Sequence, residues 1–240
     1  MNNSYLQIAS RRRSGGNFPS TGLVSYWNMD TDGSVPDSVG SNDGIINNVI
    51  YSASGKLGGA YSFDIAGSNI TVGTSADLTP PKLTVAMWVK RTATWSGTYQ
   101  SFFWAKPDAY NSPLGWQFDC ADGANENTPL VFRVSGNNYI AKANNVDPDT
   151  FFPLNEWVYI AATFDSDTNV GALYKNGVSV ADGGYGTADI INSNTVTKYI
   201  GHPHSPYGNN GLMDEIGIWS RALTPDEITA LYNSGDGLTY

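Results

Sequence analysis

Short alternating runs of apolar residues, separated by turn-forming residues, recur along most of this chain and constrain its fold more than any other feature. In LTVAMWVKR, Val85, Met87 and Val89 fall on one face of an extended strand. Ala86 and Trp88 fall on the other face. A strand that is apolar on both faces is typical of the centre of a sandwich of two sheets. Similar runs, among them QSFFWAK, LVFRVS and NEWVYIAATFD, follow at short spacing, so we predict a mostly β fold.

Two local signals sharpen this prediction. Asn176-Gly177 lies between two alternating runs and is the residue pair that accepts positive φ at both central positions of a type I′ turn, so a two-residue hairpin is expected there. Near the end of the chain, Thr224-Pro225-Asp226-Glu227 has the pattern of a capping box with proline at the first helical position. We predict a short closing helix. Its residues Ile228, Leu231 and Tyr232 should point inward, and Gly235 should end it.

Composition divides the chain into a basic N-terminal segment and an acidic remainder. Residues 1–20 hold Arg11, Arg12 and Arg13 and no acidic residue, although the whole chain carries a net charge of −9. We predict a flexible anchoring tail over 1–20 and a single domain over 21–240. The three arginines could contact nucleic acid or an acidic partner, such as other protein chains of an assembly, or simply be solvated. An acidic body disfavours nucleic acid and membrane partners.

Cysteine and hydropathy patterns exclude two further classes. Cys120 is the one cysteine, so the chain has no internal disulfide, and we expect this residue to be a small buried apolar side chain. No stretch has the length and apolarity of a signal peptide or a membrane span. His202 and His204 lie in a Pro/Gly/Asn-rich stretch with no further histidine or cysteine nearby, which favours an exposed loop over a metal site.

Seven segments in order make the chain resemble the laminin-G-like, concanavalin A-like jelly-roll family. They are LVSYWNMD, DSVGSNDG, GKLGGAYSFD, LTVAMWVKR, NEWVYIAATFD, ALYKNGVSVA and GLMDEIGIWSRALTPDEITALY. The resemblance covers roughly residues 21–240 and implies two antiparallel sheets of about six or seven strands each, packed face to face, with the short helix after them. Domains of this family bind glycans or proteins and are usually not enzymes, although the fold also hosts glucanases and polysaccharide lyases.

Catalytic patterns of the related enzymes are missing from this sequence. The glucanases carry a Glu-x-Asp-x-x-Glu run that sets two carboxylates about 5 Å apart. Here the nearest candidate is the adjacent pair Asp214-Glu215, whose side chains should point to opposite faces of a regular strand. Neither the lyase motifs nor a Gly-x-Ser-x-Gly run is present. We therefore expect no enzymatic activity.

The resemblance also implies a structural calcium ion that ties the first strand to the last. Asp30 in YWNMD and Asp214 in MDEI match the positions of the two carboxylates, and Asp37 and Asn42 could add oxygens. Several hard oxygen ligands from different segments suit Ca²⁺. The alternative is that Asp214 caps a turn or faces water, while Asp30 and Asp37 form Asx turns.

Aromatic residues fall into two groups. We expect Trp27, Trp88, Trp157 and Trp219, which alternate with apolar residues inside the strands, to be core residues. A second group clusters in the less regular middle of the chain and is the candidate glycan-binding set: Trp95, Tyr99, Trp104, Tyr110 and Trp116. Each of these could instead be a packing residue.

Together these features predict a non-catalytic structural or adhesion protein that binds carbohydrate at a surface. With no signal peptide, no disulfide and a single domain, we expect it to belong to a larger assembly, such as a virion-like particle with phage capsid decoration or fibres, anchored by residues 1–20. The expected location is therefore the virion surface or another extracellular surface. The alternatives are a free carbohydrate-binding lectin or, less favoured, a polysaccharide-degrading enzyme of the same fold.

Overall fold

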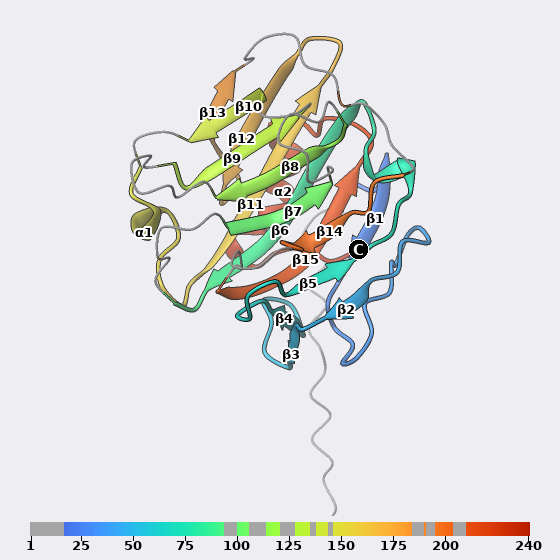
Figure 1. Cartoon of the computed structure of the whole chain (residues 1–240). Helices are drawn as coiled ribbons and strands as arrows, with labels where there is room; N and C mark the ends of the chain where they lie inside the picture. Colours follow the sequence, from blue (N-terminus) through green and yellow to red (C-terminus); the bar gives the residue numbers. More distant parts are fainter. Residues whose placement is uncertain are drawn as a thin grey trace, which may run out of the picture.

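The computed structural model shows two antiparallel sheets packed face to face (Figure 1). The structure describes residues 17–93, 100–105, 114–120, 128–134, 138–143, 146–183, 190, 195–203 and 210–240. These residues form an eight-stranded sheet and a seven-stranded sheet, as the alternating runs and the family resemblance predicted.

The eight-stranded sheet is called the first sheet. Its order is β13-β12-β11-β6-β15-β4-β3, and β1 also pairs with β15. Its strands are β1 (Leu23–Trp27), β3 (Ile50–Ser52), β4 (Ala60–Ser62), β6 (Lys82–Arg91), β11 (Trp157–Asp165), β12 (Val170–Lys175), β13 (Val178–Gly183) and β15 (Gly211–Trp219). The two-faced run LTVAMWVKR forms β6, which pairs with β11 on one side and β15 on the other. It is the central strand that its pattern predicted.

The seven-stranded sheet is called the second sheet, and its order is β10-β9-β8-β7-β14-β5-β2. Its strands are β2 (Ile45–Asn47), β5 (Asn69–Thr71), β7 (Gln100–Ala105), β8 (Trp116–Cys120), β9 (Leu130–Val134), β10 (Asn138–Ala143) and β14 (Tyr199–Gly201). Strands β7 to β10 are consecutive in sequence, but β14 lies between β7 and β5, which come much earlier in the chain. The sheet therefore joins side chains whose proximity no local pattern predicts.

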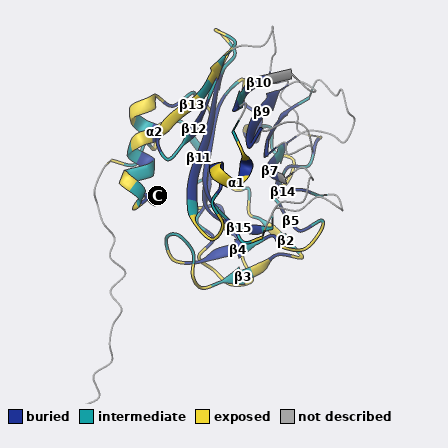
Figure 2. Cartoon of the chain, turned by 90° about the vertical axis from the view of Figure 1, so that its left-hand side faces the viewer, coloured by how far each residue is buried: buried dark blue, intermediate teal, exposed yellow. Residues whose placement is uncertain are grey.

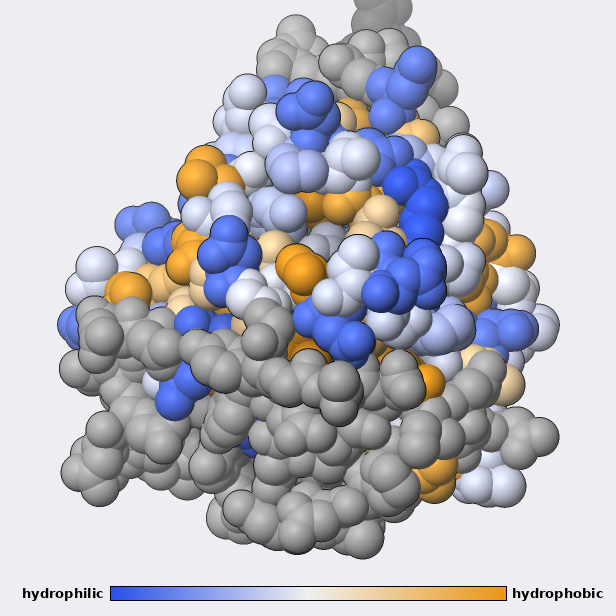
Figure 3. Space-filling view, turned by 90° about the horizontal axis from the view of Figure 1, so that it is seen from above, coloured by the Kyte–Doolittle hydropathy of each residue, from blue (hydrophilic) through white to orange (hydrophobic). Residues whose placement is uncertain are grey.

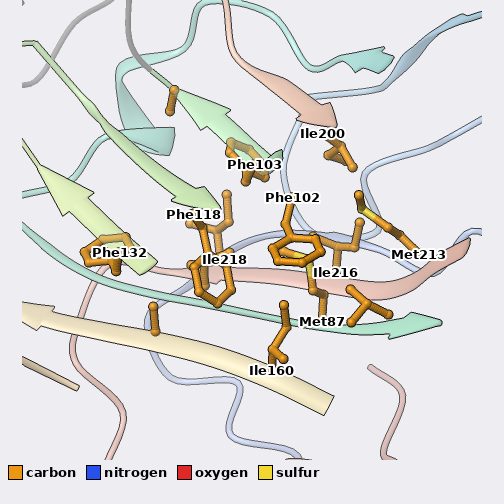
Figure 4. Close-up of a cluster of buried hydrophobic side chains, with 14 of the residues drawn as sticks. Met87, Phe102, Phe103, Phe118, Phe132, Ile160, Ile200, Met213, Ile216 and Ile218 are labelled. Carbon is orange, nitrogen blue, oxygen red and sulfur yellow. The ribbon is translucent and has the colours of Figure 1, made fainter. Parts of the chain in front are cut away.

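The main core fills the space between the two sheets (Figure 4). It takes one side chain in two from most strands. Met87 and Ile160 come from the first sheet, and Phe118 and Phe132 come from the second. Trp27 and Cys120 are also buried here, as expected. Burial of apolar side chains, which contributes about 25 cal/mol per Å² of apolar area removed from water, is the main stabilising contribution to such a fold.

A second, smaller core lies on the other side of the first sheet, beneath the C-terminal helix α2 (Pro225–Tyr232) (Figure 2). Trp88 and Trp219 point into it, Trp157 packs against it, and Ile228 and Leu231 cover it from the helix. The capping box is present as predicted, because Thr224 Oγ1 accepts from Glu227 N. The predicted end of the helix at Gly235 is wrong: α2 ends at Tyr232, and Asn233 caps it in the left-handed conformation at φ +48°.

Three short helical segments complete the described structure. They are η1 (Ala76–Leu78), α1 (Pro148–Phe151) and η2 (Asn233–Gly235). The hairpin between β12 and β13 has the predicted two-residue turn, with φ +50° at Asn176 and +79° at Gly177. Both positive values are those that a type I′ turn requires.

The N-terminal contacts move the predicted domain boundary. Phe18 lies 6.0 Å from Trp219 and 5.6 Å from Tyr240, measured between ring centroids. The carbonyl of Pro19 accepts a hydrogen bond of 2.6 Å from Trp219 Nε1. Residues from about 17 onward therefore belong to the folded domain, and the boundary predicted at residue 20 falls too late. Arg11, Arg12 and Arg13 lie outside the described residues.

Candidate functional site

Strand alternation gives the second sheet a core face and an outer face, which points away from the first sheet. In β8, Trp116, Phe118 and Cys120 point into the core, so Gln117 and Asp119 between them point outward. In β9, Phe132 and Val134 point into the core, so Arg133 points outward. Polar side chains therefore gather on the outer face, where no core packing requires them.

Cross-strand pairing places five outward residues side by side across this face. Thr71 in β5 pairs with Tyr199 in β14, and Tyr199 pairs with Trp104 in β7. Trp104 pairs with Gln117 in β8, and Gln117 pairs with Arg133 in β9. We call Thr71, Tyr199, Trp104, Gln117 and Arg133 the polar row. At about 4.8 Å between strands, it spans about 19 Å across five strands.

Asp119 holds the charged end of the polar row in place. Gln117 Nε2 donates to Asp119 Oδ2, and Arg133 Nη1 lies 3.6 Å from the same oxygen. Gln117 and Asp119 are each 2 % exposed, and Arg133 is 7 % exposed. Buried charges are retained at low cost only when they are paired, so Asp119 and Arg133 offset each other's charge.

Two buried polar atoms near Asp119 have no hydrogen-bond partner: Gln117 Oε1 and Ser101 Oγ. Ser101 lies in β7 opposite Asp119 in β8, so both atoms belong to the same part of the outer face. A buried polar atom without a partner costs about 1–3 kcal/mol. Such atoms are explained when a ligand supplies the missing hydrogen bond.

Trp104 provides the aromatic part of the site. Its ring is half-buried and lies 4.7 Å from the ring of His202, measured between centroids, with 59° between the planes. His202 is therefore buried against a tryptophan, and the exposed loop expected for this residue is wrong. A partly exposed indole beside polar groups has the features of a sugar-binding platform.

The other predicted aromatic ligands have different outcomes. Trp116 is 0 % exposed, its ring stacks on Phe103, and its Nε1 donates to the Leu78 carbonyl at 2.8 Å. Trp116 thus points into the main core, away from the outer face, and cannot contact a ligand there. Trp95, Tyr99 and Tyr110 lie outside the described residues.

Sequence reasoning missed Gln117, Asp119 and Arg133, although a signal was present. WQFDC and LVFRV are short strand patterns in which polar residues alternate with large apolar ones. That alternation predicts an outward polar side, and only the pairing of β8 with β9 shows that the two sides are adjacent.

The four predicted calcium ligands separate into two groups. Asp37 accepts backbone hydrogen bonds from Tyr26, Val39 and Asn42. The Asn42 amide donates to Ser25 Oγ at 2.8 Å. These two side chains stabilise the loop after β1, and their proposed role as metal ligands is not supported. Among the described residues, no group of three or more Asp, Glu, His or Cys side chains could hold a metal ion.

Asp30 and Asp214 are brought together by one loop, because both carboxylates accept hydrogen bonds from its backbone. Asp30 Oδ1 accepts from Gly59 N at 2.8 Å. Asp214 Oδ2 accepts from Lys56 N at 2.8 Å and from Leu57 N at 2.9 Å. The loop is the GKLGG stretch, whose glycines are needed because a Cβ at Gly58, at φ +84°, would collide with the Asp30 carboxylate.

A β-bulge overturns the prediction that Asp214 and Glu215 point to opposite faces. The pairing of β15 with β6 shifts between Asp214 and Gly217, and Glu215 has φ +53°. Met213 and Ile216 on either side both point into the main core (Figure 4). The extra residue therefore leaves both carboxylates on the other face of the first sheet.

Burial determines the protonation of this pair. It raises the pKa of Asp214 to about 8; hydrogen bonds from Leu57 and Lys56 lower this pKa, and the Asp30 carboxylate raises it. Burial likewise raises the pKa of Glu215 to about 9, although the nearby Thr239 hydroxyl acts in the opposite direction. By hydrogen-bond geometry, Asp214 Oδ1 and both Glu215 oxygens have no partner. Asp30 and the orphaned Asp214 Oδ1 thus fit a cation site that backbone carbonyls or water would complete.

Outside the outer face of the second sheet and the Asp30 and Asp214 carboxylates, the surface indicates no further site in the described residues. No helix in the described part of the chain has the length and apolarity needed to cross a membrane. On the described part of the surface in Figure 3, hydrophobic and hydrophilic residues are mixed.

The family comparison agrees with the fold. The model of the laminin G-type family described as "Concanavalin A-like lectin/glucanases superfamily" matches residues 64–229, which is more than half of the chain. The chain belongs to this family. A search of curated proteins finds no match.

Solved structures show the same fold at low sequence identity. Domain 4 of AbnA, an extracellular arabinanase from Geobacillus stearothermophilus solved with arabinotriose, matches with a TM-score of 0.65 and 20 % identity, covering 87 % of this chain and 97 % of that one. Trypanosoma rangeli sialidase with the inhibitor DANA matches with a TM-score of 0.68 and 16 % identity, covering 94 % and 35 %.

The binding domain of Paraclostridial Mosquitocidal Protein 1 matches with a TM-score of 0.67 and 17 % identity, covering 90 % of this chain and 53 % of that one. This chain thus spans about a third of the sialidase and about half of the mosquitocidal chain. At these identities the likeness establishes the fold, and the neighbours include carbohydrate-active and binding proteins.

Proposed function

We propose that this protein is a non-catalytic carbohydrate-binding protein and that the glycan lies on the outer face of the second sheet. The observation that carries the proposal is the polar row, in which a partly exposed Trp104 stands between Tyr199 and Gln117. Sugar rings stack on such aromatic faces, and their hydroxyls hydrogen-bond to adjacent polar groups. The arabinotriose complex of the arabinanase domain, which has the same fold, is consistent with it.

The outer face supports binding better than catalysis. Glycoside hydrolysis commonly needs two carboxyl groups about 5–10 Å apart. Among the described strand residues of the second sheet, Asp119 is the single carboxylate, and it is already engaged by Gln117 and Arg133. The pair Asp214 and Glu215 lies on the first sheet and is buried. We therefore keep the non-enzymatic assignment as part of the proposal.

A glycan array first selects candidate polysaccharides. Retention of the protein in gels that contain these polysaccharides then tests this function. Replacing Trp104 by Ala should weaken retention about tenfold, because a ring stacked on an aromatic side chain contributes on the order of 1–3 kcal/mol. Tyr240→Ala is a matched control, since Tyr240 is an exposed aromatic residue near β1 of the first sheet. Equal retention of wild type and Trp104→Ala, with both folded by circular dichroism, would place binding elsewhere.

Calcium belongs to the same proposal as a structural ion. Asp30 and Asp214 would hold it, and its charge would favour the ionised form of Asp214 and join the end of β1 to β15 and to the GKLGG loop. Thermal melting with calcium or with a chelator tests this, as set out for Asp214 below.

The proposal also includes display of the domain on a larger assembly. It rests on the basic residues Arg11, Arg12 and Arg13, which precede a compact acidic domain. Under this proposal residues 1–16 attach the domain to other chains of a virion-like or other extracellular particle, and the glycan-binding face serves adhesion. Truncation at residue 17, described below, tests the anchoring role.

A further inference from the structure

The hydrogen bonds around Gln117 determine what chemistry its free oxygen can accept. Because Nε2 donates to Asp119 Oδ2, the orientation of the amide is fixed, and Oε1 is left as an acceptor without a partner. Gln117 is almost fully buried, so bulk water does not satisfy this oxygen. Only a group with an O–H or N–H can complete it.

Ser101 adds a second unsatisfied group beside the first. Its Oγ is buried without a partner, and its strand position is directly opposite Asp119. A hydroxyl can both donate and accept, so Ser101 also suits a ligand hydroxyl. A sugar ring on Trp104 would bring hydroxyls toward Gln117, because the two residues are cross-strand neighbours.

Charge at the same place disfavours an acidic ligand. Asp119 Oδ2 already accepts from Gln117 and lies 3.6 Å from Arg133 Nη1, so the arginine faces a carboxylate of the protein itself. A ligand carboxylate beside Gln117 would meet two acceptors, Gln117 Oε1 and Asp119, and could donate to neither. Lys142 points outward in β10 and lies in the row of Ser101 and Asp119, where Val131 separates it from Asp119.

We propose that the outer face selects neutral, hydroxyl-bearing glycans and rejects sugars that carry a carboxylate, with Gln117 and Ser101 as the residues that determine this specificity. The inference rests on the proposed glycan-binding function and narrows it to one ligand class. Ligand hydroxyls donate to Gln117 Oε1 and pair with Ser101 Oγ, while a uronic or sialic acid carboxylate could accept from Ser101 but leaves Gln117 Oε1 unsatisfied.

The test compares probes that differ only in the carboxylate. Polygalacturonate and alginate are each used beside their carboxyl-reduced forms, in which every carboxylate has become a CH₂OH group, and lactose is used beside sialyllactose. Retention and titration are measured with the full chain in about 0.5 M salt, where the Debye length is only about 4 Å, so that repulsion by the acidic body is screened. The neutral member of at least one pair should bind about tenfold more tightly or better.

Ser101→Ala separates a ligand contact from a structural role. Since Ser101 Oγ has no partner in the protein, its removal should leave the melting temperature unchanged or raise it, while affinity for the neutral probe falls about tenfold. Ser68→Ala is the matched control. Ser68 Oγ is likewise buried without a partner, and Ser68 directly precedes β5, outside the polar row. Ser68→Ala should therefore leave the affinity for the neutral probe unchanged and should not lower the melting temperature.

Each remaining outcome overturns a defined statement. Equal or tighter binding of the acidic probes overturns the selectivity and leaves the proposed function standing. Unchanged affinity of Ser101→Ala, with Trp104→Ala impaired, removes Ser101 from the site. Failure of every probe, neutral or acidic, across the array overturns the proposed function itself and the selectivity with it.

Discussion

At the scale of single residues, the buried position of Asp214 is explained by the hydrogen bonds that it accepts from one loop. Its Oδ2 accepts two backbone hydrogen bonds from Lys56 and Leu57, more than 150 residues earlier in the chain. Burial raises its pKa to about 8, so without a cation the carboxyl is mostly protonated at pH 7. The same residue can thus stabilise the loop by itself or, when ionised, bind a cation through the free Oδ1.

Substitutions at Asp214 distinguish these two roles. Asp214→Asn keeps an acceptor for the loop and matches the neutral carboxyl, so in the presence of a chelator it should change the stability by less than about 1 kcal/mol. Asp214→Ala removes the acceptor of two buried N–H groups and should cost about 1–3 kcal/mol. Calcium should raise the melting temperature of the wild type, and both variants should lose this response in calorimetry.

Asp37→Asn is the control for the metal assignment. Asp37 stabilises the loop after β1, so its loss should lower stability while the calcium response persists. A wild-type melting temperature that is equal in calcium and chelator would show that Asp214 acts on the loop alone.

At the scale of elements, the helix α2 covers the smaller core and depends on one ionised side chain. Glu227 accepts from Arg221 Nη1 at 2.8 Å and from Nη2 at 2.6 Å, and it also completes the capping box through Thr224 N. The bonds from Arg221 are the main reason that the pKa of Glu227 falls to about 2. The helix is therefore held partly by a charge that acid can remove.

The pH dependence has a defined sign. Because the pKa of Glu227 is lower in the folded state than its ordinary value of 4.5, its contribution is fully present above about pH 4.5 and is lost as the pH falls toward 2. Glu227→Gln should cost about 1 kcal/mol at pH 7, since it loses the ion pair while keeping an oxygen for the cap. The difference in melting temperature between wild type and variant should shrink between pH 4.5 and 2. Asp226→Asn, in the same turn, serves as the control, and parallel pH curves for Glu227→Gln and wild type would contradict the role of this charge.

What could be predicted from the sequence was limited by how far each signal reaches along the chain. The Asn176-Gly177 turn, the capping box and the two faces of β6 depend on residues within a few positions of each other, and the structure confirms them. The bulge at Glu215 was missed because alternation assumes a regular strand. The cluster of Gln117, Asp119 and Arg133 needs the register of β8 against β9, which no local pattern specifies.

At the scale of the whole molecule, the first and last described segments meet over the first sheet. Phe18 lies between Trp219, Tyr26 and Tyr240, and the Pro19 and Thr21 carbonyls accept from Trp219 and Arg221. Both ends of the domain therefore lie on the side opposite to the outer face of the second sheet, as Figure 2 shows for the C-terminus beside α2. A domain attached at this side would present the proposed glycan-binding face outward.

Truncations at two points test this arrangement, because they separate folding from anchoring. A chain that starts at Asn17 should melt like the full chain, since all contacts of Phe18 and Pro19 remain. A chain that starts at Thr21 loses a partly buried phenylalanine and the bond to Trp219, and should be less stable by about 2–4 kcal/mol in urea unfolding.

Light scattering on the same three chains tests whether residues 1–16 are the anchor. If residues 1–16 join the domain to other copies or to a particle, only the full chain should assemble, although the chain from Asn17 is equally stable. Equal assembly of the full chain and the chain from Asn17 would show that the basic segment is not the anchor and that any assembly depends on the folded domain.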